Sequence, residues 1–282
     1  MRTSPSSSAQ RARQGIAQRL REIRLDAGLT ARAIAKAAGW HESKASKIEH
    51  ARTVPSEADI RAWCDACGAE DQATELIAAS RAADLMYVEW KRLQRTGLRQ
   101  LQESKMQMYA PVRHFRVYCS NVIPGLFQTP AYAGALLSSI AEFRETPNDV
   151  TEAVAARVAR SRFLYEGDHR FGVLVEEWVL RCRIGDPGVM AGQLGHLLAV
   201  MSLPSVSLGV IPLAAGRQIW PVEAFNIFDD SLVQVELLTA EVNVSQPSEV
   251  AQYIRGFNRM ADMAVYGGQA RQLIAAAITA LQ

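Results

Sequence analysis

Apolar residues recur at helical spacing through the first third of the chain. In the first helix they fall on one face and are followed by a glycine that can end the helix: Ile16, Leu20, Ile23, Ala27 and Gly28. Four further helices are predicted over residues 30–38, 42–50, 56–68 and 71–83. Thr30 and Ser56 are N-cap residues, and the acidic residues Glu57 and Asp59 suit the first turn after Ser56. These five short helices predict an all-α domain over residues 11–83.

The segments that flank this domain have weaker patterns. Residues 1–10 are rich in serine and lack periodicity, which is typical of a flexible tail. Residues 84–110 keep a helical pattern with Gly97 in the middle, and we expect a connecting helix there, either continuous or in two pieces.

Beyond Pro111 the pattern changes to a mixture of strands and helices. Residues 113–120 alternate, with Phe115 and Val117 on one side and Tyr118 on the other. Further strands are predicted over residues 171–175, 206–211, 223–228 and 232–237, and helices over residues 129–139, 150–165 and 187–201. Two helices split by Gly267-Gly268 fill residues 249–281. The chain is therefore predicted to be multi-domain, with an all-α five-helix domain followed by an α+β domain over residues 111–282.

Composition adds an asymmetry of charge to this picture. Apolar residues make up 49% and charged residues 21% of the 282 residues, as in ordinary globular proteins. The formal net charge is only +2. However, residues 1–52 contain 11 basic and 4 acidic residues, a net charge of +7, and the remainder contains 20 basic and 25 acidic residues, a net charge of −5. Such an asymmetry indicates either a surface that meets a polyanion or a solvated basic face.

The basic segment has the spacing of a helix-turn-helix motif over residues 31–50. Ile34 is apolar and faces the core, Ala35 is small where a second helix crosses above it, and Gly39 gives the backbone freedom that a tight turn needs. The second helix then packs back through three residues: Trp40, Ala45 and Ile48. This combination predicts binding to duplex DNA. The alternative is a helical bundle in which the glycine turn is incidental.

These residues resemble the Xre, or phage-repressor-like, helix-turn-helix family. The matching positions are Leu20-Arg21, Arg24, Gly28-Leu29-Thr30, Ala35, Gly39-Trp40, Ser43, Ser46-Lys47-Ile48-Glu49 and Pro55-Ser56. Two positions depart from the family pattern: His41 stands where Ser or Thr usually caps the recognition helix, and Ala51 replaces the usual glycine after it. We expect a weaker cap and an altered loop from these departures, with DNA binding retained.

The rest of the chain resembles a group of actinobacterial Xre regulators with a long C-terminal domain, similar to the WhiJ and antitoxin-like regulators of streptomycetes. The positions that match are Trp90, residues 124–129 (PGLFQT), Tyr132-Ala133, Glu176-Glu177, Met190, Gln193-Leu194, Tyr253 and Phe257. The resemblance implies a transcriptional regulator that is encoded beside a small partner protein. It further implies control of development, of secondary metabolism or of a toxin–antitoxin-like pair.

The recognition helix predicts specific contacts with DNA. Glu42 and Ser43 at its start are placed for base edges, and Lys47, one turn further along the same face, is placed for guanine or a phosphate. The residues expected to hold the phosphate backbone are Lys44, Arg52, Thr53, and Arg32 or Lys36 on the preceding helix. A solvated surface role is the alternative for each of these basic side chains. Glu49 is expected to pair within the domain, because an acid beside phosphate is unfavourable.

The second domain is expected to receive a signal, because a DNA-binding domain alone needs far less chain. A small protein partner is the first hypothesis and a small-molecule effector the second. A further alternative is that the whole chain is a protein-interaction module that does not bind DNA, and salt-dependent binding to a duplex would distinguish the two. A ligand pocket would be lined by aromatic residues, although each of them also suits a plain core: Trp90, Tyr109, Phe115, Tyr118, Trp178, Trp220 and Phe225. We also predict binding to a pseudo-palindromic site as a homodimer, with this domain as the dimer element.

Other functional classes have little support in the sequence. Walker, nucleophile-elbow and dinucleotide-binding motifs are absent, and Glu176 and Glu177, if adjacent on a strand, point to opposite faces. We therefore expect no enzyme, no cofactor and no metal. Cys64 and Cys67 form a C-x-x-C pair without further ligands, so the four cysteines are expected to be free structural thiols in a reducing cytoplasm. No stretch is long and apolar enough to predict a membrane span, and no secretory signal is predicted.

Overall fold

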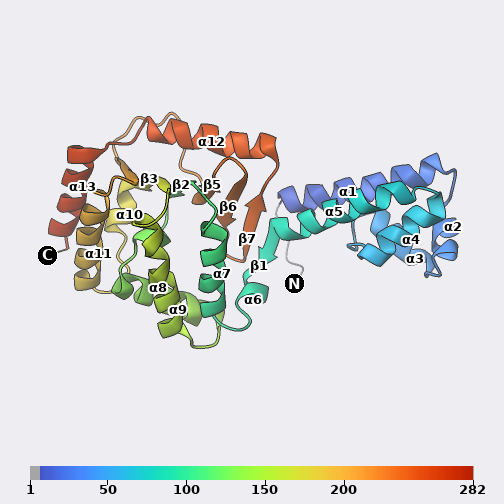
Figure 1. Cartoon of the computed structure of the whole chain (residues 1–282), viewed down its shortest axis with the longest axis horizontal. Coiled ribbons are helices and arrows are strands. Elements are labelled where there is room, and N and C mark those ends of the chain that lie inside the picture. The colour runs from blue at the N-terminus through green and yellow to red at the C-terminus, as the bar shows by residue number, and fades with distance from the viewer. Residues whose placement is uncertain (1–6, 282) are drawn as a thin grey trace. The chain divides into compact units, whose positions relative to one another are not determined.

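The computed structural model describes residues 7–281, and the chain divides into two units, Met1–Val88 and Glu89–Gln282 (Figure 1). Each unit has its own hydrophobic core. The first unit is all-α and the second combines a mixed sheet with helices, so the predicted fold class is confirmed. Among residues 7–281, no helix combines the length and the apolar character that crossing a lipid bilayer requires.

Five helices make up the N-terminal unit. They are α1 (Ser7–Asp26), α2 (Ala31–Ala37), α3 (Glu42–Glu49), α4 (Glu57–Cys67) and α5 (Glu70–Met86). Their apolar faces meet around Trp63, which is fully buried and donates its indole N–H to the carbonyl oxygen of Leu20 at 3.0 Å. A capping box between Ser56 and Asp59 begins α4, and Gly68 ends it in the left-handed conformation. The five predicted helices are therefore all present.

Two predicted segments differ from the structure. The flexible tail predicted over residues 1–10 is wrong for residues 7–10, which begin α1, while residues 1–6 lie outside the described residues. The connecting helix predicted over residues 84–110 is wrong as a continuous element, because α5 is followed by β1 (Tyr87–Glu89), α6 (Trp90–Leu93) and α7 (Arg99–Tyr109).

The break between α6 and α7 has a physical cause at Gly97. Its φ of +108° favours glycine, and a side chain there would collide with the carboxylate of Asp149. That carboxylate accepts the backbone N–H groups of Leu98 and Arg99, both at 2.8 Å, and so begins α7 from a distant part of the chain. The local pattern of apolar residues could not predict this contact, because Asp149 is about 50 residues away in the sequence.

Six strands of a mixed sheet lie wholly within the C-terminal unit, in the order β7-β6-β5-β2-β3-β4. The strands are β2 (His114–Cys119), β3 (Arg170–Glu176), β4 (Val206–Ile211), β5 (Phe225–Phe228), β6 (Leu232–Glu236) and β7 (Ala240–Val244). β2, β3 and β4 are parallel, whereas β5, β6 and β7 continue as an antiparallel meander. β7 is an addition to the predicted strands.

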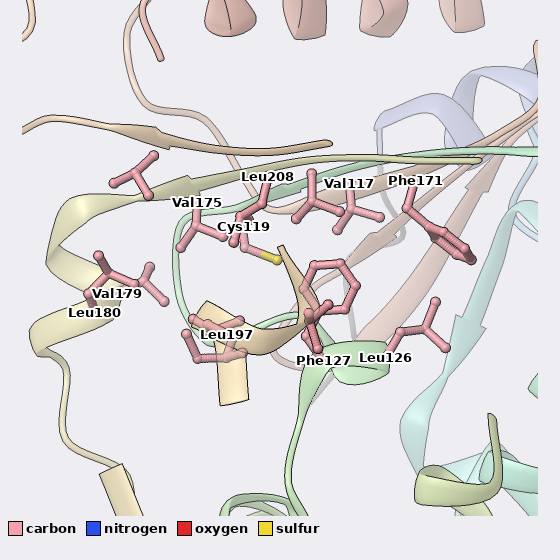
Figure 2. Packing of buried hydrophobic residues seen from close by; sticks show 14 of the residues in the cluster. Val117, Cys119, Leu126, Phe127, Phe171, Val175, Val179, Leu180, Leu197 and Leu208 are labelled. Carbon is pink, nitrogen blue, oxygen red and sulfur yellow. The ribbon is translucent and has the colours of Figure 1, made fainter. Parts of the chain in front are cut away.

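Helices cover the two faces of this sheet. They are α8 (Pro130–Arg144), α9 (Val150–Ala159), α10 (Glu177–Arg181), α11 (Pro187–Val200), α12 (Pro247–Ala261) and α13 (Gly267–Thr279), with the 3-10 segments η1 (Gly125–Phe127) and η2 (Arg160–Leu164). On one face, Val117, Phe171 and Leu208 meet Phe127 and Leu197 in a large apolar cluster (Figure 2). On the other face α12 packs against β4, β5 and β6.

Candidate nucleic-acid interface

Helices α2 and α3 form the predicted helix-turn-helix. Thr30 caps α2 by accepting the N–H of Ala33 at 3.1 Å. Gly39 makes the turn at φ +67°, and the N–H of Trp40 donates to the carbonyl oxygen of Ala35 at 2.7 Å. The left-handed backbone conformation at this position strongly favours glycine, which explains why a glycine occurs at position 39 of the motif.

The two positions that depart from the Xre pattern have different structural outcomes. His41 does cap α3, because its Nδ1 accepts the N–H of Ser43 at 3.3 Å and lies 2.9 Å from the Ser43 hydroxyl. Ala51 adopts φ +50°, the conformation that glycine would adopt without strain. The predicted altered loop is therefore a glycine-type turn made by alanine.

The face of α3 that points away from the core is polar. Ala45 and Ile48 are buried against the other helices, whereas Glu42, Ser43 and Lys47 are exposed. Ser46 and His50 are also exposed. Sequence reasoning passed over these last two, although they follow Ser43 at three and seven positions and so share its helical face.

Basic and polar residues from neighbouring elements are exposed around this helix. Arg32 and Lys36 are exposed on α2, and Arg52 and Thr53 are exposed after α3, with their backbone N–H groups bonded to the carbonyl oxygen of Lys47. Arg32 also pairs with Glu42 at 2.8 Å, but the two side chains are 82% and 62% exposed. An ion pair this exposed contributes little, so Glu42 can exchange Arg32 for another donor.

Lys44 has a partner inside the domain. Its Nζ lies 2.6 Å from Oδ1 of Asp59 on α4 and 4.6 Å from the ring centroid of Trp40. Burial alone would raise the pKa of the Asp59 carboxyl, but the hydrogen bonds from Lys44 and Ser56 outweigh it and lower the pKa. The predicted phosphate contact of Lys44 therefore competes with a bond that fixes α3 against α4.

Glu49 confirms its predicted structural role. It pairs with Arg24 of α1, and the two side chains are 7% and 11% exposed. Arg24 also donates to the carbonyl oxygen of Leu29 at 2.6 Å. This buried pair ties the end of the recognition helix to the first helix.

The aromatic residues predicted as a ligand pocket do not gather in one place. Trp90 and Tyr118 contribute to the lining of a cavity of about 250 Å³ in the C-terminal unit. Phe115 is stacked on Phe171 in the core, and Trp220 is 72% exposed on a loop. Trp178 donates its indole N–H to the carbonyl oxygen of Ser120 at 2.8 Å. The prediction is therefore wrong for these three residues, whereas two residues named with them, Tyr109 and Phe225, do line the cavity.

Glu176 and Glu177, considered from the sequence as neighbours on one strand, lie on two different elements. Glu176 ends β3 and Glu177 begins α10. Glu176 is fully buried and accepts two hydrogen bonds from Arg217, both at 2.8 Å, and one from the Tyr118 hydroxyl at 2.9 Å. Glu177 accepts the N–H of Leu213 at 2.9 Å and pairs with Arg181. Both carboxylates hold residues 213–217 in place.

The four cysteines are free thiols. Cys64 and Cys119 are buried, and burial raises the pKa of Cys64 to about 11 and that of Cys119 to about 12, so both are protonated at neutral pH. Cys67 is half-buried and Cys182 is exposed. In the described part of the chain, no three His, Cys, Asp or Glu side chains are grouped so that they could hold a metal ion.

Comparisons with known proteins match the two units separately. Residues 16–77 match a family model described as a helix-turn-helix domain, and residues 103–276 match the family described as domain of unknown function DUF5753. No curated protein matches the chain significantly. A solved structure of TrmBL2, an archaeal chromatin protein that shows a novel mode of DNA binding, matches at 12% sequence identity. The match covers 75% of this chain and 70% of that one, but its TM-score of 0.32 is too low to support an argument.

Proposed function

The chain belongs to the DUF5753 family and contains a helix-turn-helix domain, and from these two facts we propose that it is a sequence-specific transcriptional regulator of the Xre type. The observation that supports this proposal is the polar, exposed face of α3 opposite buried Ala45 and Ile48. A recognition helix needs this arrangement, because one face holds the helix in the domain and the other reaches base edges in the major groove.

The proposed contacts with DNA follow from which side chains are exposed and from which of them already have a partner within the domain. Glu42 and Ser43 meet base edges, and Lys47 meets guanine or a phosphate. The backbone contacts come from Arg32, Lys36, Arg52 and Thr53. Lys44 positions α3 through Asp59 and contributes to phosphate binding only at the expense of that bond.

Salt dependence of DNA binding tests the proposal. A duplex is first selected from a random pool with the full chain, and its affinity is then measured over a range of salt concentrations. We expect Lys47→Met to reduce the slope of log affinity against log salt by about one, because one phosphate contact is lost. Arg99→Met removes the same charge from exposed Arg99 of the C-terminal unit and serves as the matched control. Equal slopes for the two variants would contradict the placement of α3 on DNA.

Base preference tests the start of the recognition helix separately. We expect Glu42→Ala to relax the preference at one base pair by about 1–3 kcal/mol, because the acceptor for a cytosine amino group is lost. The measurement is the affinity for the selected duplex and for its single-base-pair variants. An unchanged preference at every position would remove Glu42 from the base contacts.

We further propose that the regulator binds a pseudo-palindrome as a homodimer. One helix-turn-helix unit contacts few base pairs, and two copies spaced by one turn of DNA, about 34 Å, multiply the specificity. The C-terminal unit is proposed as the dimer element. Sedimentation of the full chain at micromolar concentration, alone and with the selected duplex, tests this, and a monomer under both conditions would rule the dimer out.

The C-terminal unit is proposed to receive the signal that controls DNA binding. A small protein encoded nearby, as in WhiJ-like and antitoxin-like regulators, has support from Trp220, which is exposed on a loop that Arg217 anchors to buried Glu176. Co-purification from the native host tests that version, and recovery of the regulator alone would contradict it. A small-molecule effector has support from the cavity of about 250 Å³ in the same unit.

A further inference from the structure

The cavity of about 250 Å³ lies between the sheet and three helices of the C-terminal unit. Its walls come from the α6–α7 segment, α8 and α9, together with the end of β2 and the turn that follows it. Residues 124–129, the PGLFQT segment singled out in the sequence, contribute Pro124, Gly125 and Gln128 to this wall. Ligand pockets for drug-sized molecules measure about 300–1,000 Å³, so this cavity suits a smaller molecule.

Two arginines on one side of the cavity have only neutral partners. Arg157 donates from Nε to Oε1 of Gln102 at 3.1 Å and from its terminal nitrogen to Oε1 of Gln128 at 2.7 Å. Arg160, which is 4% exposed, donates to the same oxygen of Gln102 at 2.7 Å. No carboxylate in the described part of the chain forms an ion pair with either guanidinium.

Other basic residues around the cavity are already neutralised or more exposed. Lys105 lies 2.6 Å from a carboxylate oxygen of Glu241, and that pair is buried. Arg144 is half-buried and lies over the ring of Trp90, 4.6 Å from its centroid. Glu236 is the acidic residue in the lining, and it is exposed. The charge of Glu236 partly offsets that of Arg157, but neither Arg157 nor Arg160 forms an ion pair with a carboxylate in the described part of the chain.

Arg157 remains charged at neutral pH. Burial and the neighbouring charge of Arg160 lower the pKa of Arg157 to about 10, which is still well above 7. Two guanidinium groups that share one neutral oxygen repel each other, and a buried charge without a counter-ion is strongly unfavourable. A bound anion would remove both penalties, and a carboxylate matches the planar fork of a guanidinium.

Two further buried atoms in this wall have no partner in the described protein. They are Nε of Arg160, a donor, and Oε1 of Gln94, an acceptor on a residue that is 3% exposed. A ligand that satisfies both presents an anionic acceptor to Arg160 and a hydrogen-bond donor to Gln94. Leu98, Leu137 and Ile140 give the lining an apolar part.

We propose that this cavity binds a small organic carboxylate that has an apolar body and one hydrogen-bond donor. Arg157 and Arg160 hold the carboxylate, the leucine and isoleucine side chains hold the body, and Gln94 accepts from the donor. The apolar lining favours this class over inorganic phosphate, which has no body to bury. Binding itself does not depend on DNA, and only its effect on operator affinity rests on the proposed function.

Calorimetric titration of the full chain tests the site with a defined set of probes. The probes are hexanoate, benzoate, 3-hydroxybenzoate and 4-hydroxybenzoate, the amide of each as a neutral analogue, and inorganic phosphate. We expect at least one carboxylate to bind at least tenfold more tightly than its amide. We expect a hydroxybenzoate to bind more tightly than benzoate, because its hydroxyl reaches Gln94.

Variants assign the binding to the cavity. Arg160→Met removes the charge and the unpartnered Nε, while Gln102 keeps the donor Arg157, so the fold is retained. We expect this variant and Arg157→Gln each to weaken carboxylate binding at least tenfold. Arg162→Met makes the same change at an exposed position two residues away and is expected to bind as the parent does. Gln94→Met is expected to remove the preference for the hydroxyl group.

Three results would overturn the proposal. The first is that no carboxylate binds more tightly than its amide. The second is that Arg160→Met and Arg162→Met bind equally well, and the third is that phosphate binds while the organic probes do not. Binding of a carboxylate without any effect on the affinity for a selected duplex would keep the site and reject its role in regulation. Absence of duplex binding with intact carboxylate binding would reject the proposed function and keep the site.

Discussion

Arg24 in the N-terminal unit and Arg160 in the C-terminal unit are buried to a similar extent, with 9% and 4% of their surface exposed. Arg24 has a carboxylate partner, Glu49, and a backbone carbonyl. Arg160 and its neighbour Arg157 share the neutral amide oxygen of Gln102. Arg24 therefore has a carboxylate counter-ion from its own unit, whereas Arg160 has none among the described residues.

This difference indicates a structural role for Arg24 and a ligand-binding role for Arg160. A buried charge with a counter-ion from its own domain contributes to a fixed structure, and removal of one partner leaves the other buried and unpaired. A buried charge without a counter-ion destabilises the empty site, so its retention points to a ligand that arrives from outside. Four variants test this comparison, from the largest expected effect to the smallest.

We expect the largest effect from Arg24→Met. It leaves Glu49 buried without its cation, which costs about 3–5 kcal/mol of the stability of the N-terminal unit. The measurement is hydrogen exchange of peptides from residues 16–77 in the full chain. The double variant Arg24→Met/Glu49→Met is expected to recover most of the loss, and equal losses in the single and double variants would refute the assignment of the cost to the unpaired acid.

Asp59→Ala tests a pair of intermediate burial. It removes the capping box of α4 and the partner of Lys44, for an expected loss of about 1–2 kcal/mol at pH 7. The pKa of Asp59 is lowered in the folded state. Its charge therefore stabilises the fold above the unfolded pKa of about 3.9, and this contribution is lost as the pH falls through the lower folded pKa.

Chemical unfolding of the full chain between pH 7 and pH 2.5 checks this pH dependence. The stability difference between the parent and Asp59→Ala is expected to shrink over the acidic part of the range. Asp65→Ala, which changes an exposed aspartate later in the same helix, is the control. A difference that stays constant with pH would show that the charge of Asp59 contributes nothing.

Ala51→Gly tests whether the N-terminal unit is free of backbone strain next to the exposed face of α3. Because Ala51 adopts φ +50°, we expect glycine to raise the stability by about 1 kcal/mol or less, after allowance for the entropy of glycine in the unfolded chain. Ala38→Gly, at a helix end with φ −84°, is the matched control and is expected to lower stability. Thermal unfolding of both variants decides the sign.

Arg160→Met is expected to have the smallest effect on stability and completes the comparison with Arg24→Met. We expect no loss, or a gain of up to about 1 kcal/mol, because no acid is left unpaired and Gln102 keeps Arg157 as a donor. Hydrogen exchange of peptides from residues 103–276 measures it. A loss as large as that of Arg24→Met would mean that Arg160 has a structural role.

The helix-turn-helix could be predicted from sequence because its signals are local. Gly39 marks a left-handed turn, Ile34 and Ile48 mark buried faces, and Thr30 marks a cap, and each lies within a few residues of what it determines. The paired role of Glu49 also followed from local reasoning, since an acid on a DNA-binding helix needs a partner within the domain. The partner itself, Arg24, is 25 residues away and was not predicted.

The cavity could not be predicted, because its parts are separated along the chain. Gln102 and Arg157 are 55 residues apart, and they meet because α7 and α9 pack together. The aromatic residues predicted to line a pocket include Trp90 and Tyr118, which do line the cavity. They also include Phe115, Trp178 and Trp220, which do not, since aromatic residues also occur in cores and loops. The signal that was available in the sequence was the trio of arginines at 157, 160 and 162.

The sequence by itself determined the two units, the five helices of the first and the face of α3 that reaches outward, because helical periodicity and turn residues act over short distances. Only the tertiary structure decided which charges are paired. Lys44 meets Asp59 and Arg24 meets Glu49, while Arg157 and Arg160 meet each other across one amide oxygen. Burial sets the energy of each of these charges, and burial depends on how distant segments pack.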